Sequence, residues 1–220
     1  ASKARAIQIL KDTQIEALKK EEQFDLYKNV ELPLSYVLAD MEYQGIHADI
    51  NVLEDLGKDF KSRLDVLETT IHGFAGETFN IASPKQLGVI LFEVLQLPHA
   101  KKTKTGYSTN AEVLQKLIGH HPIIEPILEY RALSKLNSTY IEGLKTSIMD
   151  DGKIHTIYMQ ALTTTGRLSS VEPNLQNIPI RTEEGRLIRK IFKASEQRLL
   201  VGADYSQIEL RVLAHIADVK

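Results

Sequence analysis

Cysteine is absent from all 220 residues of the chain. Its absence excludes disulfide frameworks, thiolate zinc sites, iron–sulfur ligation and cysteine nucleophiles, and it favours a reducing, intracellular location. Long apolar runs are also lacking, since none approaches the roughly 20 residues that a membrane span requires. Residues 1–20 contain no apolar stretch of the kind found in signal peptides. We therefore expect a cytoplasmic protein with no membrane partner.

The composition itself is that of an ordinary globular protein. Apolar residues make up 43% of the chain, charged residues make up 25%, and the mean hydropathy is −0.18. These values exclude a disordered chain, and the length allows one large domain or two small ones with a buried core.

The charge is distributed unevenly along the chain. The formal net charge is only −2, which by itself gives no sign of a nucleic-acid-binding protein. However, residues 40–80 carry nine acids and three bases, whereas residues 99–145 carry seven bases and four acids, and residues 153–198 carry eight bases and four acids. Two basic stretches are consistent with a phosphate-binding surface, although such runs are more often simply solvated faces.

Helical patterns dominate the first two thirds of the sequence. Pro33 and Gly45 bound a predicted helix, with proline in its first turn and glycine at its end. Apolar residues then recur at spacings of three and four over residues 50–74, and again over residues 123–149. A narrow apolar stripe needs an equally long partner, so the sequence predicts a long antiparallel helix pair packed like a coiled coil.

Two short helices are predicted between the long ones. The strings Ser83–Gln86 and Thr109–Glu112 both match a capping box, in which the first residue caps the helix. The stretch His99–Ser108 is basic and poor in apolar residues, which predicts an exposed loop at the tip of the helical arm. The pair His120-His121 precedes a proline and has no further ligand at a useful spacing, so a turn explains it better than a metal site.

The pattern changes after Gly152. Residues 154–162 and 198–205 are rich in β-branched and aliphatic residues and are predicted strands, and residues 206–220 read as a helix. The sequence therefore predicts an α+β fold, in which a helical arm is followed by an antiparallel sheet. The sheet is expected to be incomplete, because so few strands and one helix leave apolar faces uncovered.

Asp204 is the first candidate for chemistry. It stands at the end of the second predicted strand, where a carboxylate is costly to bury unless it is paired or binds a metal ion. Capping of the following helix is an equally good explanation of this residue alone. A second candidate, the D-x-E string formed by Asp40 and Glu42, lies in a predicted helix, where residues two apart point about 200° apart and cannot share a metal ion.

Three strings carry a resemblance to a known family. They are TGRLSS (165–170), EPNLQNIPIR (172–181) and DYSQIELR (204–211), and in this order and spacing they resemble the family A DNA polymerases. Residues 79–93, 127–140 and 185–194 also resemble that family. The resemblance covers residues 33–218 and implies a tail of an exonuclease-like domain or linker (1–32), a helical thumb and its base (33–150), and the first part of a palm (151–220).

The resemblance implies template-directed DNA synthesis, in which two Mg²⁺ ions support the addition of dNTPs to a primer 3′ end during replication or repair. It assigns Asp204 and the Tyr205 carbonyl to the two metal ions. It also assigns Ser206, Gln207, Ile208 and Glu209 to the incoming nucleotide, with Glu209 filling the space of a 2′-hydroxyl. Without the resemblance, a solvated helix glutamate is the better interpretation of Glu209.

The resemblance also implies contacts with primer–template DNA. The expected phosphate contacts are Arg131, Lys135, Ser138 and Thr139, and the expected contacts near the primer end are Arg167, Asn174, Gln176, Asn177 and Arg181. Minor-groove contact suits an enzyme that must accept every sequence. The alternatives are a solvent-facing helix edge for the first group and, for the Asn/Gln cluster, a loop that hydrogen-bonds to itself.

Two parts expected of such a polymerase are missing from the sequence. There is no basic fingers helix and no second palm aspartate, so we expect residues 1–220 to be inactive alone, as part of a monomeric, nucleoid-associated bacterial polymerase. The alternative from a different class is a catalytically silent DNA-binding module that retains the thumb and part of the palm.

Overall fold

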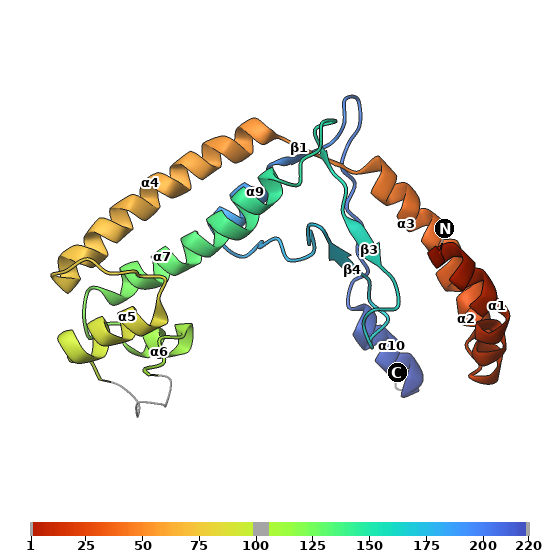
Figure 1. The fold of residues 1–220 in the computed structure, drawn as a ribbon, viewed down its shortest axis with the longest axis horizontal. Coiled ribbons are helices and arrows are strands. Elements are labelled where there is room, and N and C mark those ends of the chain that lie inside the picture. Colours follow the sequence, from red (N-terminus) through yellow and green to blue (C-terminus); the bar gives the residue numbers. More distant parts are fainter. Residues whose placement is uncertain (1, 99–105, 219–220) are drawn as a thin grey trace.

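The structure, a computed structural model, describes residues 2–98 and 106–218. Most of the predicted tip loop, His99–Ser108, lies outside the described residues. The described chain forms an arch with two helical limbs, and a short stem of strands and one helix projects between them (Figure 1). Among the described residues, no helix is both long enough and apolar enough to cross a membrane.

The N-terminal limb consists of helices that follow one another closely. They are α1 (Ser2–Lys20), α2 (Phe24–Leu26), the π-helical segment η1 (Tyr27–Glu31) and α3 (Leu32–Gln44). The predicted helix between Pro33 and Gly45 is confirmed as α3. Gly45 ends it with φ +59°, and a Cβ at this position would lie only 2.7 Å from Cε1 of His155. Glycine is therefore required both by the backbone conformation and by the neighbouring ring.

The second limb, which we call the arm, spans residues 50–145. Its helices are α4 (Ile50–Ala75), α5 (Pro84–Val89), η2 (Ile90–Val94), α6 (Ala111–Lys116), α7 (Ile124–Leu136), η3 (Asn137–Glu142) and α8 (Gly143–Lys145). Two apolar cores fill it, one at the tip around Leu91 and Ile127 and one at the base around Phe60 and Leu133.

The predicted antiparallel helix pair is confirmed. α4 packs against the continuous run α7–η3–α8, and the contacts run in opposite directions along the two chains. Glu54 pairs with Lys145 at 2.8 Å, and Arg63 pairs with Glu129 at 3.2 Å. Between them, the ideal Cβ position of Gly57 lies 2.9 Å from Cγ2 of Ile141, so Ile141 packs closely on α4 where α4 carries no side chain.

One of the two predicted capping boxes starts at the wrong residue. Ser83 caps α5 as expected, since its side chain accepts from the Gln86 N–H at 3.4 Å. The cap of α6 is Asn110 and not Thr109, because Asn110 Oδ1 accepts from the Val113 N–H at 2.9 Å. Thr109 is instead buried against the arm. The predicted turn at His121 is confirmed, since its Nδ1 accepts from the Ile123 N–H at 3.1 Å.

Two small antiparallel sheets complete the base and confirm the α+β class. In the first, β1 (Ile46–Ala48) lies between β2 (Lys153–Ile154) and β5 (Phe192–Lys193). In the second, β3 (Ile157–Met159) pairs with β4 (Ser169–Val171). The predicted strand at residues 154–162 is therefore divided between two sheets. Helix α9 (Glu183–Arg189) packs beside α4 and α7, and α10 (Ile208–Ile216) ends the stem.

The predicted strand at residues 198–205 is wrong. This segment forms no strand in the structure, and Leu199 and Val201 are 87% and 89% exposed. Leu200, which is 61% exposed, lines a groove of about 700 Å³ beside α3 and β2. A strand needs a neighbouring backbone to hydrogen-bond with, and none of the described residues provides one here. Asp204 consequently does not end a buried strand.

Two glycines in α4 allow a matched test of the close helix approach. Gly57→Ala should lower the free energy of unfolding by about 1–2 kcal/mol, because overpacking against the buried, β-branched Ile141 outweighs the gain in helix propensity. Gly73→Ala is the control, since nothing lies within 4 Å of its Cβ position. It should raise that free energy by about 0.5–1 kcal/mol. Chemical denaturation checks both, and equal stabilisation by the two variants would contradict the close approach.

Candidate nucleic-acid interface and metal site

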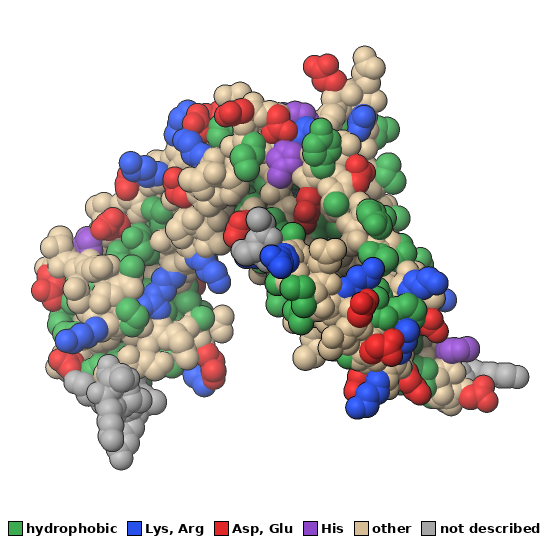
Figure 2. All heavy atoms as spheres, turned by 45° about the vertical axis from the view of Figure 1, so that its right-hand side comes forward, with side chains coloured by type: hydrophobic (Ala, Val, Ile, Leu, Met, Phe, Trp, Pro, Cys, Tyr) green, Lys and Arg blue, Asp and Glu red, His purple; other side chains and the backbone are tan. Residues whose placement is uncertain are grey.

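The predicted site residues occupy three places in the fold. Lys135, Ser138 and Thr139 lie on α7 and η3 of the arm, the Asn/Gln cluster lies in the loop after β4, and Asp204 to Glu209 lie around the start of α10. The arm and the stem face each other across the hollow of the arch (Figure 1). Figure 2 shows Lys and Arg side chains along the underside of the left-hand lobe, facing this hollow.

A pair of buried hydroxyls fixes the loop after β4, which we define as residues 172–177. Thr156 Oγ1 lies 2.6 Å from Ser170 Oγ and 2.9 Å from the carbonyl oxygens of Val171 and Pro173. Ser170 Oγ also accepts from the Leu175 N–H at 3.1 Å. Because both hydroxyls are buried, their partners must come from the protein, and the loop backbone supplies them.

Two of the polar side chains predicted to contact DNA stabilise this loop internally. Asn174 Oδ1 accepts from the Gln176 N–H at 2.9 Å. The Gln176 side chain accepts from the Ser170 N–H at 3.2 Å and donates to the Leu168 carbonyl at 3.3 Å. The structure thus gives both side chains the self-bonding role that was the alternative interpretation of the cluster. Asn177 and Arg181 are exposed, and the Asn177 carbonyl accepts a hydrogen bond from the Tyr140 hydroxyl.

Arg167 and Glu209 come together from positions 42 residues apart. Arg167 Nη2 lies 3.4 Å from Glu209 Oε1, and the two side chains are 76% and 74% exposed. An ion pair this exposed contributes at most about 1 kcal/mol. It therefore leaves both groups available to other partners. The contact places the TGRLSS string beside the DYSQIELR string, as expected if both serve one site.

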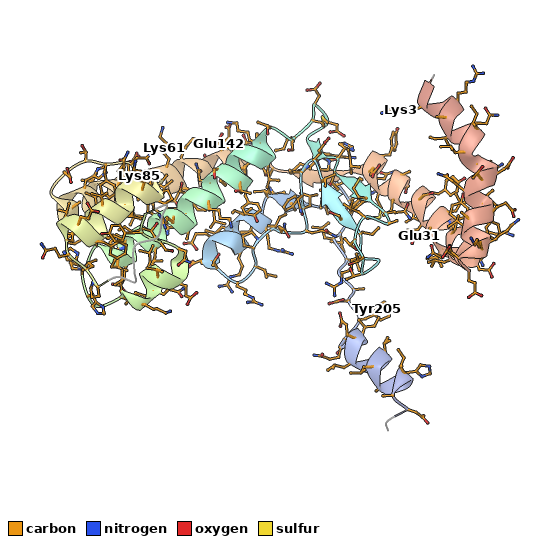
Figure 3. The ribbon with its side chains drawn as sticks, turned by 60° about the horizontal axis from the view of Figure 1, so that its bottom comes forward. Lys3, Glu31, Lys61, Lys85, Glu142 and Tyr205 are labelled. Atoms are coloured by element: carbon orange, nitrogen blue, oxygen red, sulfur yellow. The ribbon has the colours of Figure 1, made fainter. Side chains whose placement is uncertain are left out.

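Asp204 and Tyr205 lie in an extended, exposed segment where the chain leaves the sheets. Figure 3 shows Tyr205 at the start of the stem helix, away from the arm. The N-cap of α10 is Gln207, in a left-handed conformation with φ 55°, and Ser206 contributes its carbonyl to the Arg211 side chain at 2.9 Å. Asp204 is therefore not the capping residue of α10. This removes the alternative role that its sequence position left open.

The oxygen donors at Asp204 and Tyr205 are of the kind that Mg²⁺ prefers, a carboxylate and a backbone carbonyl. One carboxylate and one carbonyl are fewer ligands than a metal centre needs. Within residues 2–98 and 106–218, no group of three or more His, Asp or Glu side chains lies close enough to hold a metal ion. The donor chemistry of Asp204 fits Mg²⁺, but this segment offers one carboxylate where two ions require several.

The residues expected to bind phosphate differ in their exposure to solvent. Lys135, Ser138 and Thr139 are exposed on the arm. Arg131 is instead partly buried, and its guanidinium donates to the Thr109 carbonyl and to Thr109 Oγ1, the latter at 3.2 Å. Burial lowers the pKa of Arg131 from its usual value. Its hydrogen bonds hold the tip of the arm together, a role that spacing along a helix does not reveal.

Sequence reasoning missed Thr156 and Tyr140, which connect parts of the interface. Thr156 lies in a segment that was interpreted only as a strand. Tyr140 was counted as an apolar position in the second long helix, yet its hydroxyl joins the arm to Asn177. A tyrosine on the apolar side of a helix usually finds a polar partner for its hydroxyl, and this was the signal that could have marked it.

Comparisons with known proteins agree with this geometry. Residues 50–220 match the family described as DNA polymerase family A, and the chain belongs to this family. It is similar to DNA polymerase I of Lactococcus lactis subsp. lactis, with 56% identity over 217 residues, covering 99% of this chain and 25% of that protein. It is likewise similar to DNA polymerase I of Bacillus caldotenax, with 58% identity over 219 residues, covering 98% and 25%.

A solved structure shows the same fold. The POL domain of Pol1 from M. smegmatis, in complex with DNA primer-template and dNTP, is 41% identical with a TM-score of 0.87. The match covers 98% of this chain and 38% of that chain. The chain spans about a quarter of the length of the curated relatives that it matches.

The Arg131 contact can be tested by removing its acceptor. Thr109→Val should lower the free energy of unfolding by about 1–3 kcal/mol, because a partly buried guanidinium N–H then lacks a partner. Thr69→Val is the control, because Thr69 is exposed and donates only within its own helix. It should change that free energy by less than about 0.5 kcal/mol. Denaturant titration checks this, and equal effects would argue against the Arg131 contact.

Proposed function

We propose that the chain forms part of a template-directed DNA polymerase, in which it binds primer–template DNA and supplies one ligand set for catalytic Mg²⁺. The observation that carries this is the Arg167–Glu209 contact, which brings together two of the strings that resemble family A polymerases, TGRLSS and DYSQIELR, the second of which begins at Asp204. The names of the relatives and the DNA and dNTP in the neighbouring structure support it. We also propose that the polymerase acts as a monomer in the bacterial cytoplasm, associated with the nucleoid.

Asp204 and the Tyr205 carbonyl are the proposed metal ligands. When bound, Mg²⁺ would stabilise the charge that develops as the primer 3′-hydroxyl displaces pyrophosphate from a dNTP. Asp204 is exposed, so its carboxyl group is accessible to an ion from solvent. Residues Ser206, Gln207 and Ile208 bring the chain past the nucleotide, and Glu209 lies against its sugar. Since one carboxylate is too few for two ions, residues 1–220 do not extend a primer by themselves.

The DNA would lie in the hollow of the arch. Lys135, Ser138 and Thr139 contact phosphates of the duplex, which position it without reading its sequence. Arg167, Asn177 and Arg181 lie nearer the primer end, while Asn174 and Gln176 shape the 172–177 loop that carries Asn177. Arg131 serves this surface through Thr109. In this arrangement, the exposed Arg167–Glu209 pair separates at little cost when DNA and nucleotide arrive.

The metal role predicts the effect of one substitution. Asp204→Asn in the polymerase that contains this segment should lower the rate of nucleotide addition at least about 100-fold, because a ligand of the charge-stabilising ion is lost. Primer–template affinity should change little. The matched control is Asp65→Asn on the exposed face of α4, which should extend primers at the parent rate. Single-turnover primer extension measures both, and undiminished synthesis by Asp204→Asn would refute the assignment.

The phosphate role predicts a change in salt dependence. Lys135→Ala should weaken binding to unrelated duplexes equally and reduce the slope of log affinity against log salt by about 1. Lys61→Ala, at an exposed position of α4, should leave that slope unchanged (Figure 3). Fluorescence anisotropy at several salt concentrations gives both slopes. A loss confined to one DNA sequence, or an unchanged slope, would exclude a phosphate contact.

A further inference from the structure

The C-terminal end of α3 is held to the segment around β2 and β3 by three polar contacts. Lys153 Nζ donates to the Gln44 carbonyl at 2.8 Å, and the Tyr158 N–H donates to Glu42 Oε1 at 2.6 Å. The third contact joins His155 Nδ1 to the Glu42 carbonyl at 2.6 Å. The last carbonyls of a helix carry partial negative charge, so cationic partners are favoured there.

His155 lies between two groups that can only accept hydrogen bonds. Its Nδ1 faces the Glu42 carbonyl, and its Nε2 lies 3.0 Å from Asp151 Oδ2. A neutral imidazole has a single N–H and can satisfy only one of them, whereas an imidazolium satisfies both. The ring also packs on Gly45, whose missing Cβ leaves the space that the ring occupies. The geometry therefore selects the doubly protonated, charged form of His155.

The charged groups around His155 favour this form on balance. Asp151 is its carboxylate partner, and Glu42 lies on α3 with its carboxylate bound to the Tyr158 N–H. Lys153 opposes the positive charge. The hydrogen bond to the Glu42 carbonyl and then that to Asp151 raise the pKa of His155 above its usual 6.5, and Lys153 lowers it. The adjoining groove is lined by further titratable or charged groups, namely Asp40, His47, Glu196 and Arg198.

His155 connects directly to the candidate interface. The next residue, Thr156, bonds to Ser170 and to the backbone of the 172–177 loop, and β3 begins at Ile157. β3 pairs with β4, which follows Arg167. A change in the hydrogen bonds of His155 therefore acts on the 172–177 loop through Thr156, and on Arg167 through the pairing of β3 with β4. Of the three contacts, the one at His155 is made by an imidazole, a group whose usual pKa of about 6.5 lies near neutral pH, whereas Tyr158 contributes a backbone N–H.

We propose that the His155 imidazolium is a positioning group that fixes the β3–β4 hairpin and its DNA-facing loop on α3, so that productive binding of primer–template depends on its protonation. The effect on primer–template binding rests on the proposed function, whereas the charge state of His155 does not. Asp151 is the second member of the device, because its carboxylate accepts a hydrogen bond from the Nε2–H group of His155.

The direction of the pH dependence follows from the raised pKa. The contact is complete below the pKa of an unfolded histidine, about 6.5, and it is lost as the pH rises through the higher pKa of the folded state. The KM for primer–template should therefore rise by about tenfold over that upper range, as expected for the loss of one charge-assisted hydrogen bond.

The kinetic test compares the pH profiles of four enzymes, each the polymerase that contains this segment. For the parent, kcat/KM for a primer–template duplex at saturating dNTP should fall as His155 loses its proton. His155→Gln should lack it, and Asp151→Asn should retain it at lower pH, because removal of the carboxylate lowers the pKa of His155. His120→Gln, at an exposed site, should match the parent. Identical profiles for the parent, His155→Gln and Asp151→Asn would overturn the proposal.

A second measurement is independent of polymerase activity. The ¹⁵N spectrum of histidine-labelled protein, assigned with His155→Gln, should show both ring nitrogens of His155 protonated in most molecules at pH 6.5, where a histidine with its usual pKa is half neutral, and the ring should lose a proton as the pH rises further. A His155 ring that is mostly neutral at pH 6.5 would overturn the proposal even if the enzyme is active. If the ring is charged but the parent extends no primer at any pH, the proposed function fails while the protonated contact stands. Asp151→Asn keeps the test decisive if His155→Gln does not fold.

Discussion

The arrangement of the whole chain depends on the pairing of one short strand. β1, three residues long, hydrogen-bonds on one side to β2 and on the other to β5, so it joins segments more than a hundred residues apart. Asp49, the next residue, caps α4 by accepting from the N–H groups of Asn51 and Val52, and it binds Lys193. The hydrogen bond from Lys193, followed by that from Val52, lowers the pKa of Asp49. Asp49 therefore connects the start of α4 in the arm to β5, the strand that precedes the stem.

From this junction two surfaces extend toward the same hollow. In the arm, α4 packs against the run α7–η3–α8, and Gly57 leaves the space that Ile141 occupies. The hairpin opposite is rigid because Thr156 and Ser170 bury their hydroxyls against the loop backbone. The Tyr140–Asn177 hydrogen bond connects the two surfaces directly. A duplex in the hollow would meet the exposed side chains of Lys135, Ser138 and Thr139 at one side and Arg167 at the other.

Local sequence signals predicted the helices well. The features that depend on tertiary contacts could not be predicted from the sequence. Proline, Gly45 and the apolar period define α3 and the long pair because helix boundaries are set by neighbouring residues. The strand at 198–205 failed because pairing depends on a distant partner. Arg131 shares a helix face with Lys135, but burial and Thr109 set it apart. Arg167 and Glu209 were predicted separately, and only the fold shows that they touch. The DNA-binding role of Arg167 and the nucleotide-binding role of Glu209 stay predictions.

The central claim is that one duplex contacts both the arm and the Arg167 region. Because residues 1–220 contain no cysteine, Ser138→Cys and Thr165→Cys each introduce one thiol into this segment, which can carry a photo-crosslinker. Crosslinked positions on a primer–template duplex should then move with the primer end when the primer is shortened, with the Thr165 probe at the terminus and the Ser138 probe farther along the duplex. Crosslinked positions that do not move with the primer end, or a Thr165 probe that never crosslinks at the primer terminus, would contradict the account.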